Sequence, residues 1–163
     1  AAAGAIEPLG GTRLAMIQSS LLRLASLFPD TDCNPLLADE FNQLTGLESD
    51  HIRDFVLSHY QPGSRQDLPF WSHSGKTELP PTLDHKMQLF MAQGQVALYE
   101  EESFPDTTWV SACLGQGLWP ADYDPMLENY DFERLAARFD QMKQIIQQAA
   151  GAMPSHGEYL QQI

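Results

Sequence analysis

The residues best suited to chemistry are scattered along the sequence and form none of the common catalytic or metal-binding patterns. None of the five histidines belongs to an HExxH arrangement, and the two cysteines form no CxxC pair. No serine lies in a GxSxG elbow, and no loop has the GxGxxG or Walker spacing that holds phosphates. We therefore interpret each histidine as a structural or surface residue and expect no metal site: His51, His59, His73, His85 and His156.

One short turn has a composition suited to an anion. Gly10 and Gly11 lead directly into Thr12, where a helix is expected to start. Backbone N–H groups at a helix N-terminus attract negative charge, and glycines let a ligand approach the main chain. Such a turn suits a halide or the edge of a flavin. From the residues alone, a simple connection between elements is favoured.

The element that would position this turn is a helix over residues 12–28. Thr12 is its expected N-cap, and Pro29 is the stop signal. Apolar residues recur every three or four positions, which predicts one apolar helix face: Leu14, Ile17, Leu21, Leu24 and Phe28.

Most of the remaining pattern is also helical. A second helix should start at Asn34-Pro35 and carry an apolar face from Leu37 to Val56. Further helices are expected over 82–93, with Leu83, Met87, Phe90 and Met91 inward, over 106–116, from 131 to about 150, and in a short tail. The penultimate helix has its own apolar face: Phe132, Leu135, Phe139, Met142, Ile145, Ile146 and Ala149. Residues 96–99 suit a short strand or an extended segment, and an acidic cluster, 100–102, follows. Residues 62–81 form a predicted loop anchored by Phe70 and Trp71.

Composition excludes several classes of function. The chain has 163 residues, 43% of them hydrophobic, which is enough for a core. Its formal net charge of −13 repels nucleic acids and anionic membranes, so neither is an expected partner. No apolar run is long enough for a membrane span and no signal segment is visible, so a cytoplasmic location is expected. On composition and periodicity alone, the chain is a soluble, acidic, mainly α-helical domain of unnamed function.

Several motifs resemble the flavin-dependent tryptophan halogenase family. Residues 2–12 read AAGAIEPLGGT, which is similar to the family motif AAGFIEPLEST. Residues 52–56 (IRDFV) and 59–71 (HYQPGSRQDLPFW) continue the resemblance, the latter through its final PFW. It extends over nearly the whole chain, through 114–117 (LGQG) to 153–156 (MPSH).

The resemblance implies a chemistry and a set of roles. In the family, reduced FAD supplied by a flavin reductase reacts with oxygen, and chloride or bromide becomes an oxidant that halogenates an electron-rich aromatic such as indole or tryptophan. Thr12 and Arg13 match positions at the halide site, and Leu14 matches a flavin-contacting position. Phe104 and Trp109 are candidates to stack on an indole, although core packing is favoured for both.

The sequence also departs from the family pattern. Gly10 occupies the position of a family glutamate, so no catalytic residue is assigned within the chain. The family's GxGxxG turn, catalytic lysine and WxWxIP signature precede the EPL turn and are absent from these residues. The resemblance thus implies that residues 1–163 are the C-terminal helical part of a halogenase, with residues 1–12 ending the flavin and halide motif. We expect an irregular helical module that packs on a missing FAD-binding Rossmann-like domain and is inactive alone. A non-catalytic binding or scaffold module, or a flavin monooxygenase that has lost halide use, are the alternatives.

Overall fold

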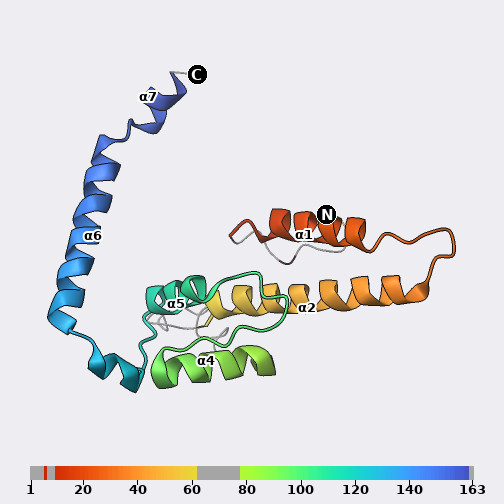
Figure 1. Cartoon of the computed structure of the whole chain (residues 1–163), viewed down its shortest axis with the longest axis horizontal. Helices are drawn as coiled ribbons and strands as arrows, with labels where there is room; N and C mark the ends of the chain where they lie inside the picture. Colours follow the sequence, from red (N-terminus) through yellow and green to blue (C-terminus); the bar gives the residue numbers. More distant parts are fainter. Residues whose placement is uncertain (1–5, 7–9, 62–77, 162–163) are drawn as a thin grey trace. The chain divides into compact units, whose positions relative to one another are not determined.

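The regular structure of the chain is helical. The computed structural model describes residue 6 and residues 10–61 and 78–161, and none of these residues forms a strand. The chain divides into two units, Ala1–Tyr123 and Asp124–Ile163 (Figure 1). The prediction of a mainly α fold is therefore confirmed. The predictions for Phe70, Trp71 and His73 lie outside the described residues.

The first unit is built around one long helix. This helix, α2 (Pro35–His59), begins as predicted, with Pro35 at its first position and the Asn34 side chain accepting a hydrogen bond from the Leu36 N–H at 3.1 Å. Three other helices contact α2, namely α1 (Thr12–Ser26), α4 (Pro81–Gln93) and α5 (Asp106–Gly115). Figure 1 shows α1 folded back along α2 after the 27–34 connection.

The core of this unit consists of two small clusters on α2. The first joins Met16 of α1 to Ile52 and Val56. The second joins Phe55 to Leu83 of α4 and Trp109 of α5. The half-buried side chain of Phe104 packs against both clusters. The predicted apolar face of α2 is therefore confirmed where these helices meet.

Helix α4 and the segment after it agree with the prediction only in part. Leu83 and Phe90 are buried as predicted, but the inward placement predicted for Met91 is wrong, since its side chain is 38% exposed. A hydrogen bond between the Met91 carbonyl and the Ala121 N–H, at 2.8 Å, shows that the main chain here faces the 117–123 loop. Residues 96–99 form no strand, which leaves the extended alternative.

Helix α1 differs from prediction at its start and in its orientation. Gly11, not Thr12, is the N-cap, and Thr12 is the first helical residue. The buried side chains are those of Thr12 and Met16. The five residues of the predicted apolar face do lie on one side, but that side is open to solvent, with exposed fractions between 42% and 74%: Leu14, Ile17, Leu21, Leu24 and Phe28.

The second unit is one long helix with short flanking turns. A 3₁₀ turn, η1 (Pro125–Asn129), precedes α6 (Phe132–Ala152), and α7 (His156–Leu160) follows. Asp131 caps α6 by accepting a hydrogen bond from the Arg134 N–H at 3.0 Å. Within this unit the predicted apolar face of α6 is exposed, except at half-buried Leu135. In the described part of the chain, no helix is both long and apolar enough to cross a membrane.

Candidate functional site

The turn before α1, residues 10–12, has a backbone that only glycine adopts readily. Gly10 and Gly11 both lie in the left-handed region, with φ values of 65° and 71°. A Cβ atom at either position would meet no other atom within 4 Å, so the space beside the turn is open. We refer to residues 10–12 as the glycine turn.

The electrostatics of the glycine turn favour an anion. The N-cap Gly11 has no side chain that could cap the helix by a hydrogen bond, and no acidic residue lies in the first turn of α1. Arg13, which follows, is exposed. The positive end of the α1 dipole attracts a negative ion, and the charge of Arg13, the second residue of the helix, adds to this attraction.

The three residues assigned to this region by the sequence point in different directions. Thr12 is 2% exposed and lies on the side of α1 that faces the core. Arg13 and Leu14 lie on the outer side, and Leu14 is 74% exposed. An anion at the glycine turn would therefore have the inward-facing Thr12 on one side. The outward-facing Arg13 and Leu14 would lie on the other side.

The two aromatic candidates differ in their surroundings. Trp109 is only 1% exposed, its Nε1 donates to a carboxylate oxygen of Glu102 at 3.4 Å, and the Lys86 ammonium lies 4.0 Å from the ring centroid. Such a ring is part of the core. Phe104 is half-buried and stacks on Phe55 with ring centroids 3.8 Å apart. Of the two, Phe104 retains the more accessible ring.

Two members of the acidic cluster noted in the sequence, Glu101 and Glu102, form ion pairs, and that of Glu102 is buried. Glu101 accepts a hydrogen bond from Arg23 Nη2 of α1 at 2.8 Å, and Glu102 pairs with Lys86 of α4. Arg23 Nη1 also donates to Glu48 of α2 at 3.1 Å. Burial would by itself lower the pKa of Arg23, but hydrogen bonds and charge from Glu48 and Glu101 raise it above its usual value. Sequence reasoning missed these pairs because the partners are up to 78 residues apart.

The described histidines have different environments. His51 is buried, stacks on Tyr99 at 5.6 Å, and its Nδ1 has no hydrogen-bond partner among the described residues. The His59 Nδ1 lies 2.8 Å from the carbonyl oxygen of Phe55. In the described ranges, no three histidine, cysteine or acidic side chains gather in a way that could hold a metal ion. His85 and His156 are exposed.

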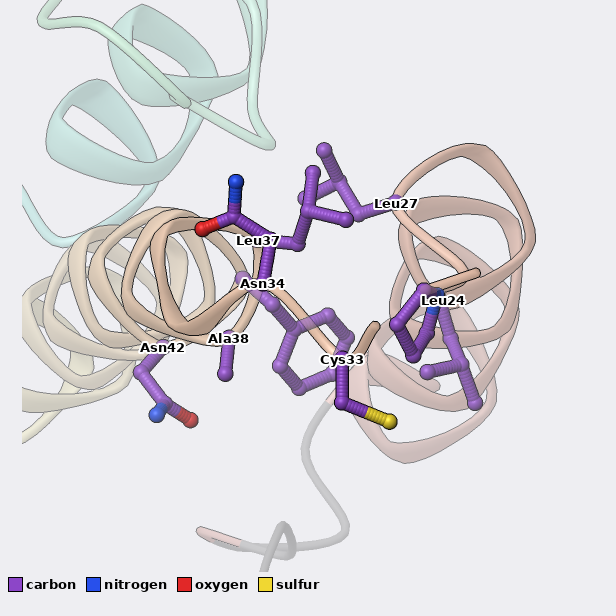
Figure 2. A pocket seen from close by; sticks show the side chains of 9 residues that line it. Leu24, Leu27, Cys33, Asn34, Leu37, Ala38 and Asn42 are labelled. Carbon is purple, nitrogen blue, oxygen red and sulfur yellow. The ribbon is translucent and has the colours of Figure 1, made fainter. Parts of the chain in front are cut away.

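An apolar pocket lies at the far end of α1. Figure 2 shows it between the end of α1 and the start of α2, with Leu24, Leu27 and Leu37 around it and Cys33 at one side. Its volume is about 280 Å³. At 1.5 Å of rise per residue, the distance along α1 from the glycine turn to Leu24 is about 20 Å. The pocket is therefore not part of the site at the glycine turn.

Comparisons with known proteins point to one family. The family described as tryptophan halogenase matches residues 1–131. The chain is 26% identical over 160 residues to the 7-chloro-L-tryptophan 6-halogenase KtzR of Kutzneria sp. (strain 744), covering 96% of this chain and 31% of the relative. It is 31% identical over 87 residues to the tryptophan 7-halogenase RebH of Lentzea aerocolonigenes, covering 53% and 16%.

Solved structures give the same picture. The flavin-dependent halogenase BrvH from Brevundimonas sp. BAL3 is similar with a TM-score of 0.89 and 34% identity, over 97% of this chain and 32% of that one. The flavin-dependent halogenase Xcc4156 from Xanthomonas campestris is similar with a TM-score of 0.88 and 31% identity, over 98% and 32%. The chain thus spans about a third of these halogenases.

Proposed function

The chain belongs to the tryptophan halogenase family, and from that membership we propose that it serves as the C-terminal part of an FADH₂-dependent halogenase acting on an electron-rich aromatic. The observation that supports this most is the glycine turn, which lies at the position of the family's halide motif, matches it at Thr12, and combines open space, a helix dipole and an exposed arginine. These features fit chloride or bromide. A reductase partner would supply the reduced flavin.

Within this proposal, the residues at the start of α1 bind rather than react. Thr12 and the Arg13 side chain would hold the halide beside the backbone, and exposed Leu14 would contact the flavin. Bound reduced FAD would supply the oxygen chemistry that turns halide into an electrophile. Gly10 has no side chain to orient that electrophile, so the catalytic groups would have to come from elsewhere in the enzyme.

The exposed apolar faces support a docking role for the module. Leu14 and Leu21 of α1, and Phe28 just beyond its end, are in solvent with 61–74% of their surface exposed. A stripe of this kind, next to the halide motif, is expected to be covered by protein. We assign it to the Rossmann-like flavin domain that makes up the rest of a halogenase, and assign residues 1–163 to the helical part that packs on that domain. Without that domain, the chain would be inactive.

The aromatic substrate would meet this part of the enzyme at Phe104. Its ring is half-buried and is held by Phe55, so it offers a fixed apolar surface for an indole. Trp109, at 1% exposure, would support that surface from behind rather than touch the substrate.

A fusion enzyme tests the proposed function. This chain would be joined to the N-terminal two thirds of BrvH, supplied with FAD, a flavin reductase and bromide, and assayed for brominated indole by mass spectrometry. We expect bromination, with a KM for bromide that rises about tenfold in Arg13→Gln, the effect of losing one charged contact. The control is Arg134→Gln, an exposed arginine on α6.

The same fusion discriminates against a scaffold role. Left-handed glycines at positions 10 and 11, where the family has a carboxylate and a serine, favour a module that folds and binds without catalysis. A fusion that binds FAD and folds cooperatively but makes no halogenated product would support that role and refute ours. An oxygenated product formed without bromide would instead indicate a monooxygenase.

A further inference from the structure

Four consecutive residues, 101–104, tie three helices together. Glu101 pairs with Arg23 of α1 and Glu102 with Lys86 of α4. The Ser103 hydroxyl donates to a carboxylate oxygen of Glu48 on α2 at 3.3 Å. Phe104 stacks on α2 and packs against the cluster that contains Met16 of α1. We call these residues the 101–104 segment.

Helix α1 has few apolar contacts that would fix its position along α2. Most of its apolar stripe is exposed, Leu24 near its end lines the pocket shared with α2, and Met16 is the only buried apolar residue of α1. Its other contacts are polar and directional. Ser19 donates to Glu48 at 2.8 Å, and Arg23 donates to Thr45 and Glu48, both at 3.1 Å. Directional bonds of this kind fix the register of one helix against another more tightly than one methionine can.

Arg23 takes part both in the polar contact between α1 and α2 and in the contact with the 101–104 segment. Its guanidinium group is 10% exposed and bridges the carboxylates of Glu48 and Glu101, which are 9% and 32% exposed. Glu101 adopts a left-handed backbone, with φ of 57°, which non-glycine residues rarely do. A backbone of this kind persists where surrounding contacts impose it.

We propose that Arg23 and Glu101 are positioning residues that fix α1, and with it the glycine turn, against the segment that carries Phe104. The consequence rests on the proposed function: the pair would set the distance between the halide site and the aromatic substrate. Arg23 touches neither ligand, and it acts through the helix on which the glycine turn lies. The packing of Phe104 against the cluster of Met16, Ile52 and Val56 provides the second point of contact.

Hydrogen exchange in the 163-residue chain tests the coupling directly. Glu101→Gln removes one carboxylate but leaves the Arg23–Glu48 pair, so the fold should persist. We expect exchange to rise about tenfold both in the 101–104 segment and in residues 14–16, at the opposite end of α1 from Arg23, as one charge-assisted hydrogen bond is lost. Asp50→Asn, which removes an exposed pair with Arg53, is the matched control and should leave residues 14–16 unchanged. Faster exchange confined to the 101–104 segment would overturn the proposal.

The KM for bromide of the brominating fusion is a second readout, and a loss of stability alone would not change it. Glu101→Gln should raise the KM for bromide several-fold, and Glu101→Asp, which keeps the carboxylate, should restore much of it. Equal KM values in the Gln and Asp variants would count against a positioning role. If the unmodified fusion makes no brominated product, the proposed function fails, while the exchange result still decides whether Arg23 and Glu101 couple the two regions.

Discussion

Lys86→Met removes the cation from the most deeply buried ion pair of the described chain. The Lys86 and Glu102 side chains are 3% and 4% exposed, and the ammonium also lies over the Trp109 ring. Methionine has nearly the same length and fills the same space, so little packing is lost. Among the residues that the structure describes, the Glu102 carboxylate then keeps only the Trp109 N–H, at 3.4 Å, as a hydrogen-bond partner.

The size of the loss follows from the burial of both groups. Removing one partner of a buried pair costs about 3–5 kcal/mol, because the remaining charge stays in a poorly solvated site. For a chain of this size, the corresponding fall in Tm is about 10 °C. Thermal and urea unfolding followed by circular dichroism measure it. Lys143→Met, at an exposed position on α6, is the control and should change the free energy of unfolding by less than about 0.5 kcal/mol.

A double variant separates charge from packing. In Lys86→Met/Glu102→Gln the amide oxygen can still accept from Trp109, and no unpaired charge remains. We expect it to recover at least about 2 kcal/mol relative to Lys86→Met alone, since a neutral replacement avoids the cost of a buried ion. The reasoning would be refuted if the double variant lost as much stability as Lys86→Met and Glu102→Gln lose together. It would also be refuted if Lys86→Met lost no more stability than Lys143→Met.

Other measurements test the remaining features. The pKa of Tyr99 is raised above its usual value of about 10 by burial and by the charges of Asp54 and Glu102. The folded chain therefore keeps this proton longer than the unfolded chain, and stability should fall as pH rises above 10. Urea unfolding between pH 9 and 11 should show a shallower fall in Tyr99→Phe. Burial also raises the pKa of the Cys113 thiol, so a thiol reagent at pH 8 should label exposed Cys33 first, and equal labelling rates would contradict the buried placement. Leu14→Gln/Leu21→Gln should change stability by less than about 0.5 kcal/mol, because both side chains are exposed, and should reduce self-association in light scattering. A large loss of stability would show that this face is covered in the isolated chain.

Local signals predicted the helices well because each depends on a few adjacent residues. Asn34 and Pro35 set the start of α2, and the Asp131 cap sets the start of α6. The predicted helix over 106–116 is α5, which ends one residue earlier. The start of α1 was misplaced by one residue because Thr12 has the type of an N-cap, whereas the left-handed Gly11 has its position.

The site was predictable only in part. The glycine turn can be recognised in the sequence because three adjacent residues form it, and the space beside it is open. Binding of an anion there stays a prediction. The sequence shows residues 100–102 as an acidic cluster, but the contacts of Glu101 and Glu102 depend on Arg23 and Lys86, which are distant in the sequence. Charge type alone does not indicate which cation a carboxylate will meet.

The orientation of α1 shows what hydrophobic periodicity leaves undetermined. The apolar stripe from Leu14 to Phe28 is regular, but an equally regular stripe of buried or half-buried residues lies opposite it, at positions 12, 16, 19 and 23. Three of those four residues are polar, so a count of apolar positions ignores them, although α2 holds Ser19 and Arg23 and the 101–104 segment also holds Arg23. A helix with an apolar stripe on one side and a hydrogen-bonded polar stripe on the other suits a place between two bodies. The polar stripe fixes the helix to its own module, because each hydrogen bond needs a particular partner group. The apolar stripe is left to pack against a second body, and apolar packing needs no particular partner group.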